Sequence, residues 1–106
     1  MTRVLHVLDH SLPLHSGYTF RTRAILKAQE AAGLEVRGIT GQRHAREAGE
    51  GAEQEEVDGL RFHRTPGLAQ GPVGLRESRE IAALDGAIRR LAGEWRPDII
   101  HAHSPA

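Results

Sequence analysis

The chain has 106 residues, of which 39% are hydrophobic and 26% charged, a size and composition that suit one small globular domain. Fourteen basic residues balance fourteen acidic ones, and this neutrality argues against a dedicated nucleic-acid-binding protein. The lack of cysteine excludes disulfides and thiolate metal sites. No apolar run in the sequence approaches the roughly 20 residues of a membrane-spanning helix, and the N-terminal segment does not resemble a signal peptide. We therefore expect a cytoplasmic protein.

The chain opens with a predicted strand and a loop. Arg3 to Asp9 has apolar side chains on both faces, which is typical of a strand in the middle of a parallel sheet covered by helices. His6 shares a face with Val4 and Leu8 and is expected to be a core histidine. The loop that follows, residues 9–17, contains one proline and two histidines.

A helix is predicted from Tyr18 to Ala32. Ser16 is suited to its N-cap, and Gly33 is suited to the left-handed position just after its end. Small side chains recur at helical spacing along it, and we expect this stripe to pack against the sheet. The stripe consists of Ala24, Ala28, Ala31 and Ala32.

A second strand is predicted from Leu34 to Thr40, with Gly38 as a weak point. Residues 41–54 are polar and lack apolar periodicity, which predicts a surface loop. In residues 55–63, the pair Asp58-Gly59 separates two short alternating segments, and this pattern predicts a β-hairpin.

The C-terminal third of the chain predicts a loop, a long helix and a strand. Residues 66–74 contain three glycines and two prolines and favour a loop. Leu75 to Glu94 is the clearest helix, and Ile99 to His103 is a third strand. The apolar stripe of the helix is spaced by three and four residues and consists of Ile81, Leu84, Ile88, Leu91 and Trp95.

The order strand, helix, strand, hairpin, helix, strand predicts an α/β fold with a parallel sheet and right-handed crossovers. We expect the first strand to lie between the second and the third. A doubly wound domain does not normally finish at its third strand, so we expect residues 1–106 to be part of a larger protein, truncated after that strand. One face or edge would then stay partly bare, which predicts a homodimer or a higher oligomer.

Two motifs carry candidate chemistry. A strand that runs through a loop into a helix N-terminus is a common anion-binding corner, so Ser16-Gly17 is either a simple cap and turn or an anion contact as well. His101 and His103 lie two residues apart on a strand and share a face, a geometry found in metal sites. No acidic residue or cysteine lies close in sequence to complete a ligand set, so we predict no metal site. We expect His101 to be structural and His103, at the strand end, to be functional.

Two further histidines belong to the same edge of the predicted sheet. His10 and His15 lie in the loop after the first strand, and each alone is typical of an ordinary surface loop. Convergence of both with His103 could instead bind an anionic substrate or an adventitious metal ion.

These segments together resemble a known family. LDHSLPLHSGYTFRTRAI, the Asp-Gly hairpin and RPDIIHAHS are similar to the N-terminal half-domain of family 4 glycosyltransferases with the GT-B fold. The first segment is most similar to the bacterial subgroup associated with exosortase and exopolysaccharide systems. The resemblance implies a partial Rossmann-like sheet on the acceptor side of a two-domain enzyme. It also implies a retaining transfer from a nucleotide-sugar donor to a glycan or lipid-linked acceptor at the cytoplasmic membrane face, with no tightly bound cofactor.

The resemblance also implies roles for particular residues. The family usually places paired glycines near the donor phosphates, and here Ser16-Gly17 stands at that position. The N–H groups of Tyr18 and Thr19 next to it are expected to be free to meet an anion. The HAHS segment implies that His103 lies on the catalytic side and that Ser104 contacts a sugar. His15 and Arg21 are assigned to substrate binding, Arg21 because it could reach an acceptor phosphate.

The acidic donor-binding motif of the family does not occur in this sequence, and other functions therefore have to be considered. The acidic donor-binding motif belongs to a C-terminal domain, so residues 1–106 alone are expected to be inactive. The main rival is a stand-alone Rossmann-like binding or interaction module. A flavodoxin-like signalling domain ranks lower because it needs an acidic cluster at the strand ends, where only Asp9 is available.

Overall fold

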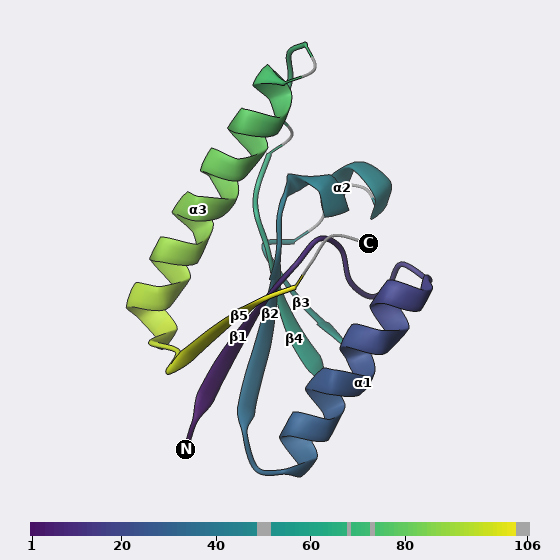
Figure 1. The fold of residues 1–106 in the computed structure, drawn as a ribbon, viewed down its shortest axis with the longest axis vertical. Helices are drawn as coiled ribbons and strands as arrows, with labels where there is room; N and C mark the ends of the chain where they lie inside the picture. The colour runs from purple at the N-terminus through teal and green to yellow at the C-terminus, as the bar shows by residue number, and fades with distance from the viewer. Residues whose placement is uncertain (49–51, 68, 73, 104–106) are drawn as a thin grey trace.

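The computed structural model describes residues 1–48, 52–67, 69–72 and 74–103. They form a five-stranded sheet with helices packed on its two faces (Figure 1). In chain order the elements are β1 (Arg3–Leu8), α1 (Gly17–Ala31), β2 (Glu35–Thr40), α2 (Gln42–Ala48), β3 (Gln54–Val57), β4 (Leu60–Arg64), α3 (Leu75–Trp95) and β5 (Ile99–Ala102).

The strand order is β3-β4-β2-β1-β5, and β3 alone is antiparallel to its neighbour within the described sheet. The predicted placement of the first strand between the second and the third is confirmed, as is the hairpin, whose second strand joins the sheet beside β2. Helix α1 lies on one face and α3 on the other (Figure 1). The fold is therefore the expected α/β arrangement with a mostly parallel, Rossmann-like sheet.

The core consists of two apolar clusters, one on each face of the sheet. Alternation along β1 sends Val4 and Leu8 toward α1 and Leu5 toward α3, as the sequence predicted. The buried members of the α1 cluster are Val4, Leu8, Leu12, Tyr18, Leu26, Val36, Leu60 and Phe62. The buried members of the α3 cluster are Leu5, Ile39, Ala87, Leu91 and Trp95.

The prediction for the buried face of α1 was wrong. The alanine stripe points to solvent, and the helix buries Tyr18, Thr19, Thr22 and Leu26 instead. These residues also recur about every four positions, so two candidate stripes competed. The observed face buries a tyrosine and a leucine, which remove more apolar surface from water than alanines do. Gly33 takes the expected left-handed conformation, with φ of 92°.

The predicted loop over residues 41–54 was also wrong in part. Gln42 to Ala48 forms the seven-residue helix α2, and β3 starts at Gln54. The segment QRHAREA lacks an apolar stripe but consists mostly of good helix formers. Periodicity therefore missed a helix that propensity favours.

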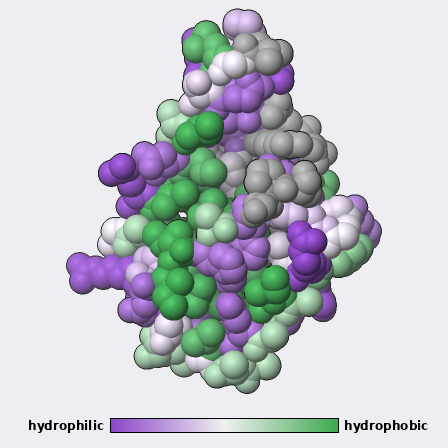
Figure 2. All heavy atoms as spheres, in the orientation of Figure 1, coloured by the Kyte–Doolittle hydropathy of each residue, from purple (hydrophilic) through white to green (hydrophobic). Residues whose placement is uncertain are grey.

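The long helix α3 and the edge strand β5 leave apolar side chains exposed. The C-terminal half of α3 packs on the sheet through Leu91 and Trp95, whereas Ile81 in its N-terminal half is 69% exposed. On β5, Ile99 is 52% exposed and Ile100 is 51% exposed. Figure 2 shows hydrophobic side chains gathered on the face that carries α3 and β5. Across the described ranges, none of the helices is both long and apolar enough to span a lipid bilayer.

Gly38 in β2 is required by the packing of the α1 cluster. A Cβ at this position would lie 2.8 Å from Cδ1 of Phe62 and 3.2 Å from Cδ1 of Leu8. Because Phe62 is 2% exposed and cannot move into solvent, Gly38→Ala is expected to lower the free energy of unfolding by about 1–3 kcal/mol. Urea denaturation of the purified variant measures this change.

Gly86 in α3 provides the matched control. A Cβ there would meet nothing within 4 Å, and the residue lies inside a helix. Gly86→Ala should therefore stabilise the protein by about 0.5–1 kcal/mol. Equal effects of the two substitutions would show that Phe62 does not restrict the space at Gly38.

Candidate functional site

The carboxyl ends of β1, β2 and β5 meet at one edge of the sheet, where ligands bind in open α/β folds. A cavity of about 370 Å³ opens at this edge beside α3. Its walls combine apolar side chains with carboxyl, amide and imidazole groups. We call it the strand-end pocket, and its lining residues are Val7, Leu8, Asp9, Gly41, Gln42, Glu77, Glu80, Ile81, Leu84 and His103.

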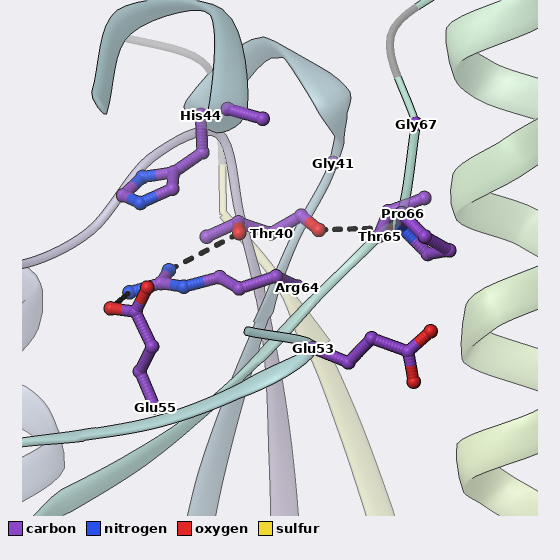
Figure 3. Close-up of a pocket in the computed structure, with 10 residues that line it drawn as sticks. Thr40, Gly41, His44, Glu53, Glu55, Arg64, Thr65, Pro66 and Gly67 are labelled. Carbon is purple, nitrogen blue, oxygen red and sulfur yellow. Dashed lines mark hydrogen bonds and ion pairs between the residues drawn. The ribbon is translucent and has the colours of Figure 1, made fainter. Parts of the chain in front are cut away.

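A second cavity of about 260 Å³ lies at the ends of β2 and β4 and shares Gly41 with the first. We call it the Arg64 pocket, after the side chain that crosses it in Figure 3. Figure 3 shows the guanidinium reaching toward Glu55, while Glu53 points away. The lining residues are Thr40, Gly41, His44, Ala45, Glu53, Glu55, Arg64, Thr65, Pro66 and Gly67.

Arg64 joins the loop after β1 to the sheet. Its Nη1 donates to Oγ of Ser11 at 2.6 Å and to Oγ1 of Thr40 at 3.2 Å. Its Nη2 donates to the carbonyl of Leu12 at 2.7 Å and forms an ion pair with Glu55 at 3.3 Å. Burial lowers the pKa of Arg64, and the carboxylate of Glu55 partly offsets that effect. Arg64 is therefore a buried charge whose partners fix the shape of this pocket.

His44 on α2 packs beside this guanidinium. Its side chain is buried, and Nδ1 accepts the N–H of Ser11 at 3.2 Å. Burial, together with repulsion from the charge of Arg64, lowers the pKa of His44 to about 4, so it is neutral near pH 7. Neither residue was among the predicted site residues. The available signal for Arg64 was a charged residue at the carboxyl end of a strand, where ligands bind in parallel sheets.

Ser16 acts as the predicted helix cap. Its Oγ accepts the N–H of Thr19 at 3.1 Å, and Oγ1 of Thr19 accepts the N–H of Ser16 at 2.9 Å. This reciprocal capping box satisfies groups that a helix start would otherwise leave unpaired. The expectation that the N–H of Thr19 is available to an anion was therefore wrong, because Ser16 already accepts it.

Gly17 and Tyr18, the other residues predicted at the donor side, differ in their surroundings. Gly17 is the first residue of α1, it is exposed, and a Cβ there would meet nothing within 4 Å. Tyr18 is 4% exposed, and its hydroxyl accepts the N–H of Asp9 at 3.1 Å. Tyr18 therefore braces the loop with its side chain, while Gly17 leaves open space at the helix start.

The two loop histidines do not form a cluster with His103. His10 is buried, and its ring nitrogens pair with Oδ2 of Asp9 at 2.9 Å and Oγ of Ser16 at 3.0 Å. His15 is exposed, and its ring lies 5.4 Å from that of Phe20. The ordinary surface description fits His15, whereas His10 is an internal part of the loop.

His103 lies at the strand-end pocket, as its position after β5 predicted. The backbone N–H of His103 donates to the backbone carbonyl of Val7 at 3.0 Å, which holds the residue beside β1. Burial and the neighbouring His101, His6 and Arg21 lower the pKa of His103 to about 4. Arg21 is exposed and its guanidinium lies 5.6 Å from the centre of the Tyr18 ring. Ser104 lies outside the described residues.

Of the other two strand histidines, His6 lies where the sequence predicted and His101 does not. His6 is fully buried, and both ring nitrogens have partners, which confirms the core prediction. The structural role predicted for His101 was wrong, because that side chain is exposed. The reason is that β5 is an edge strand, so a position that is internal in a central strand faces solvent here.

An open, mostly parallel sheet with pockets outside its carboxyl edge is a Rossmann-like arrangement, the class of fold that places its ligands at this edge. Residues 16–106 match the family model described as a glycosyl transferase 4-like domain. Because this match covers most of the chain, the chain belongs to that family. Comparisons with curated proteins and with solved structures gave no significant match. The resemblance to family 4 glycosyltransferases is thus confirmed, while the exopolysaccharide subgroup stays a prediction.

Proposed function

We propose that this chain is the N-terminal, acceptor-side part of a retaining glycosyltransferase. The whole enzyme would transfer a sugar from a nucleotide-sugar donor to a glycan or lipid-linked acceptor of exopolysaccharide synthesis. It would work in the cytoplasm, peripheral to the inner face of a bacterial membrane. Family membership supports the reaction class. The observation that carries the acceptor role is the strand-end pocket.

The strand-end pocket has the size and chemistry of a saccharide site. Its cavity of about 370 Å³ falls in the usual range for small-ligand pockets. Asp9, Glu77 and Glu80 supply carboxylates that can accept hydrogen bonds from sugar hydroxyls, and Ile81 and Leu84 offer apolar surface to a sugar face or a lipid chain. His103 at the rim is the residue we assign to the catalytic side.

The donor side of the proposal rests on the corner between β1 and α1. Ser16, Gly17 and Tyr18 would approach the donor phosphates, with Arg21 and His15 assigned to substrate. The open space around Gly17 supports this role, because a phosphate could approach the backbone there. Since Ser16 and Thr19 already cap each other, the backbone near Gly17 would supply the contact rather than Thr19.

Residues 1–106 alone are expected to bind an acceptor but to transfer no sugar, because a retaining transfer also needs a donor-binding domain. A prenyl-diphosphate-linked disaccharide should shift amide NMR signals at the strand-end pocket in a saturable way. Incubation of the chain with UDP- and GDP-sugars should give no product. Transfer by this chain, or tight binding of a nucleotide sugar, would contradict the proposal.

A matched pair of variants on α3 locates the binding. Ile81→Trp should block binding, because a bulky ring would fill the pocket that Ile81 lines. Ala82→Trp should leave it intact, because Ala82 is exposed on the same helix and is not among the pocket residues. Equal binding by both variants would favour the stand-alone interaction module instead.

Self-association stays a prediction, supported by the exposed Ile99 and Ile100.

A further inference from the structure

Three histidines come together on the α1 face of the sheet. His6 on β1 is the register neighbour of His101 on β5, and His103 follows two residues later on the same side. One ring nitrogen from each lies within 4.8 Å of those of the other two. Ring centres are 4.3 Å apart between His101 and His103 and 5.1 Å between His6 and His103. The sequence suggested only the pair His101 and His103, because His6 lies far away along the chain.

His6 is held so that a lone pair points into this cluster. Its Nε2 lies 2.7 Å from Oε1 of Gln29 on α1, so the hydrogen is assigned to Nε2. The unprotonated Nδ1 then faces Nε2 of His103 at 2.8 Å. A histidine whose second ring nitrogen donates to a carbonyl oxygen is the usual arrangement of a metal ligand with its supporting residue.

We propose that His6, His101 and His103 form a binding site for a divalent transition-metal ion, with Zn²⁺ as the representative ion. Two nitrogens bound to one zinc ion at about 2.0–2.1 Å lie about 3.4 Å apart in a tetrahedron. Nδ1 of His6 and Nε2 of His103, at 2.8 Å, lie somewhat closer than this, and the three ligand atoms all lie within 4.8 Å of one another, so a small outward movement of His103 would admit the ion. On binding, the hydrogen of His103 moves from Nε2 to Nδ1 through solvent, and the ion occupies the space between the rings.

The surroundings of the three rings suit this role. His6 is buried and fixed, His103 is partly buried, and His101 is exposed, so an ion can enter from solvent on the side of His101. Burial lowers the pKa of both His6 and His103, which keeps their nitrogens available as neutral donors near pH 7. Three imidazoles leave a fourth coordination position for water or an incoming ligand.

Metal titration of residues 1–106 tests this site directly. Isothermal titration with Zn²⁺ should show one saturable site per chain, and Co²⁺ should give the visible absorption of a low-coordinate complex. His101→Asn and His103→Asn should each weaken binding at least about 10-fold, since even changes outside the ligand set cost 10–100-fold. His15→Asn is the control, because His15 is exposed and lies outside the cluster.

A supporting substitution separates this site from incidental binding. Gln29→Glu should tighten Zn²⁺ binding. A carboxylate that accepts the hydrogen of Nε2 makes the lone pair on Nδ1 of His6 more basic, and therefore a stronger ligand for the ion. Circular dichroism verifies that each variant is folded, and His101 on an exposed edge strand is the safest position for the fold. Lack of saturable binding by the folded chain, or binding unchanged in His101→Asn and His103→Asn, would overturn the proposal. These measurements record binding alone and do not depend on glycosyl transfer.

Discussion

Replacing Arg64 with methionine is expected to lower the free energy of unfolding by about 3 kcal/mol or more. The Arg64 side chain is 8% exposed. Its guanidinium forms hydrogen bonds with Ser11, Leu12 and Thr40 and an ion pair with Glu55. Methionine fills similar space but leaves these acceptors without their donor, and each lost partner of a buried group costs about 1–3 kcal/mol. Denaturant unfolding followed by the fluorescence of the single tryptophan, Trp95, measures the change.

Arg61→Met is the matched control. Arg61 lies on the same strand, β4, but its side chain is exposed. A surface substitution of this kind usually changes stability by less than about 0.5 kcal/mol. Arg64→Lys should fall between the two, since one ammonium group cannot reproduce the fork that serves several acceptors. If Arg61→Met and Arg64→Met were equally destabilising, the contacts of Arg64 would not be what holds the β1 loop to the sheet.

The order and faces of the main strands could be predicted because they depend on local patterns. Alternation along β1 placed Val4 and Leu8 on one face and Leu5 on the other. The spacing of Leu91 and Trp95 along α3 likewise predicted the side that packs on the sheet. Right-handed crossovers then leave few arrangements for a strand, helix, strand order. These features need only neighbouring residues and general rules of chain geometry.

The contacts that build the site depend on partners far apart in the chain, and the sequence did not reveal them. Arg64 meets Ser11 across 53 positions, and His6 meets His103 across 97. The exposure of His101 depends on the place of β5 at the sheet edge. Two helical stripes competed on α1, and only the position of the sheet decides between alanines and Leu26. In each case the tertiary environment, rather than the local pattern, determines the role.

Lowering the pH from 7 to 4.5 is expected to destabilise the protein strongly, and His44 and His63 are more buried than His103, whose pKa is also about 4. The pKa of both His44 and His63 falls to about 4, from the ordinary value of 6.5. Burial is the main cause for both, followed by the charge of Arg64 for His44 and of Arg37 for His63. Between pH 6.5 and pH 4, these two histidines therefore bind protons in the unfolded chain but remain mostly neutral in the folded chain. Stability present above pH 6.5 is lost as pH falls toward 4, by about 3 kcal/mol per histidine.

His44→Asn and His63→Asn test the origin of this loss. The Oδ1 of asparagine can accept the N–H of Ser11 in place of Nδ1 of His44, but it does not titrate in this range. Each variant should therefore lose about 2–3 kcal/mol less than the unmodified chain between pH 7 and pH 4.5 in urea unfolding. Comparing the two pH values within each variant removes any change in stability that is independent of pH. A full pH-dependent loss in the double variant would assign acid sensitivity to other groups.

The two predictions are connected through the Arg64 pocket. The positive charge of Arg64 is one of the causes that disfavour a protonated His44. Arg64→Met should therefore lower stability at pH 7 and also reduce the part of the acid loss that comes from His44. Because burial remains the larger cause, that reduction should be partial. Unfolding of Arg64→Met and of Arg64→Met with His44→Asn at both pH values measures this coupling, and unchanged acid loss from His44 without Arg64 would show that burial alone sets its pKa.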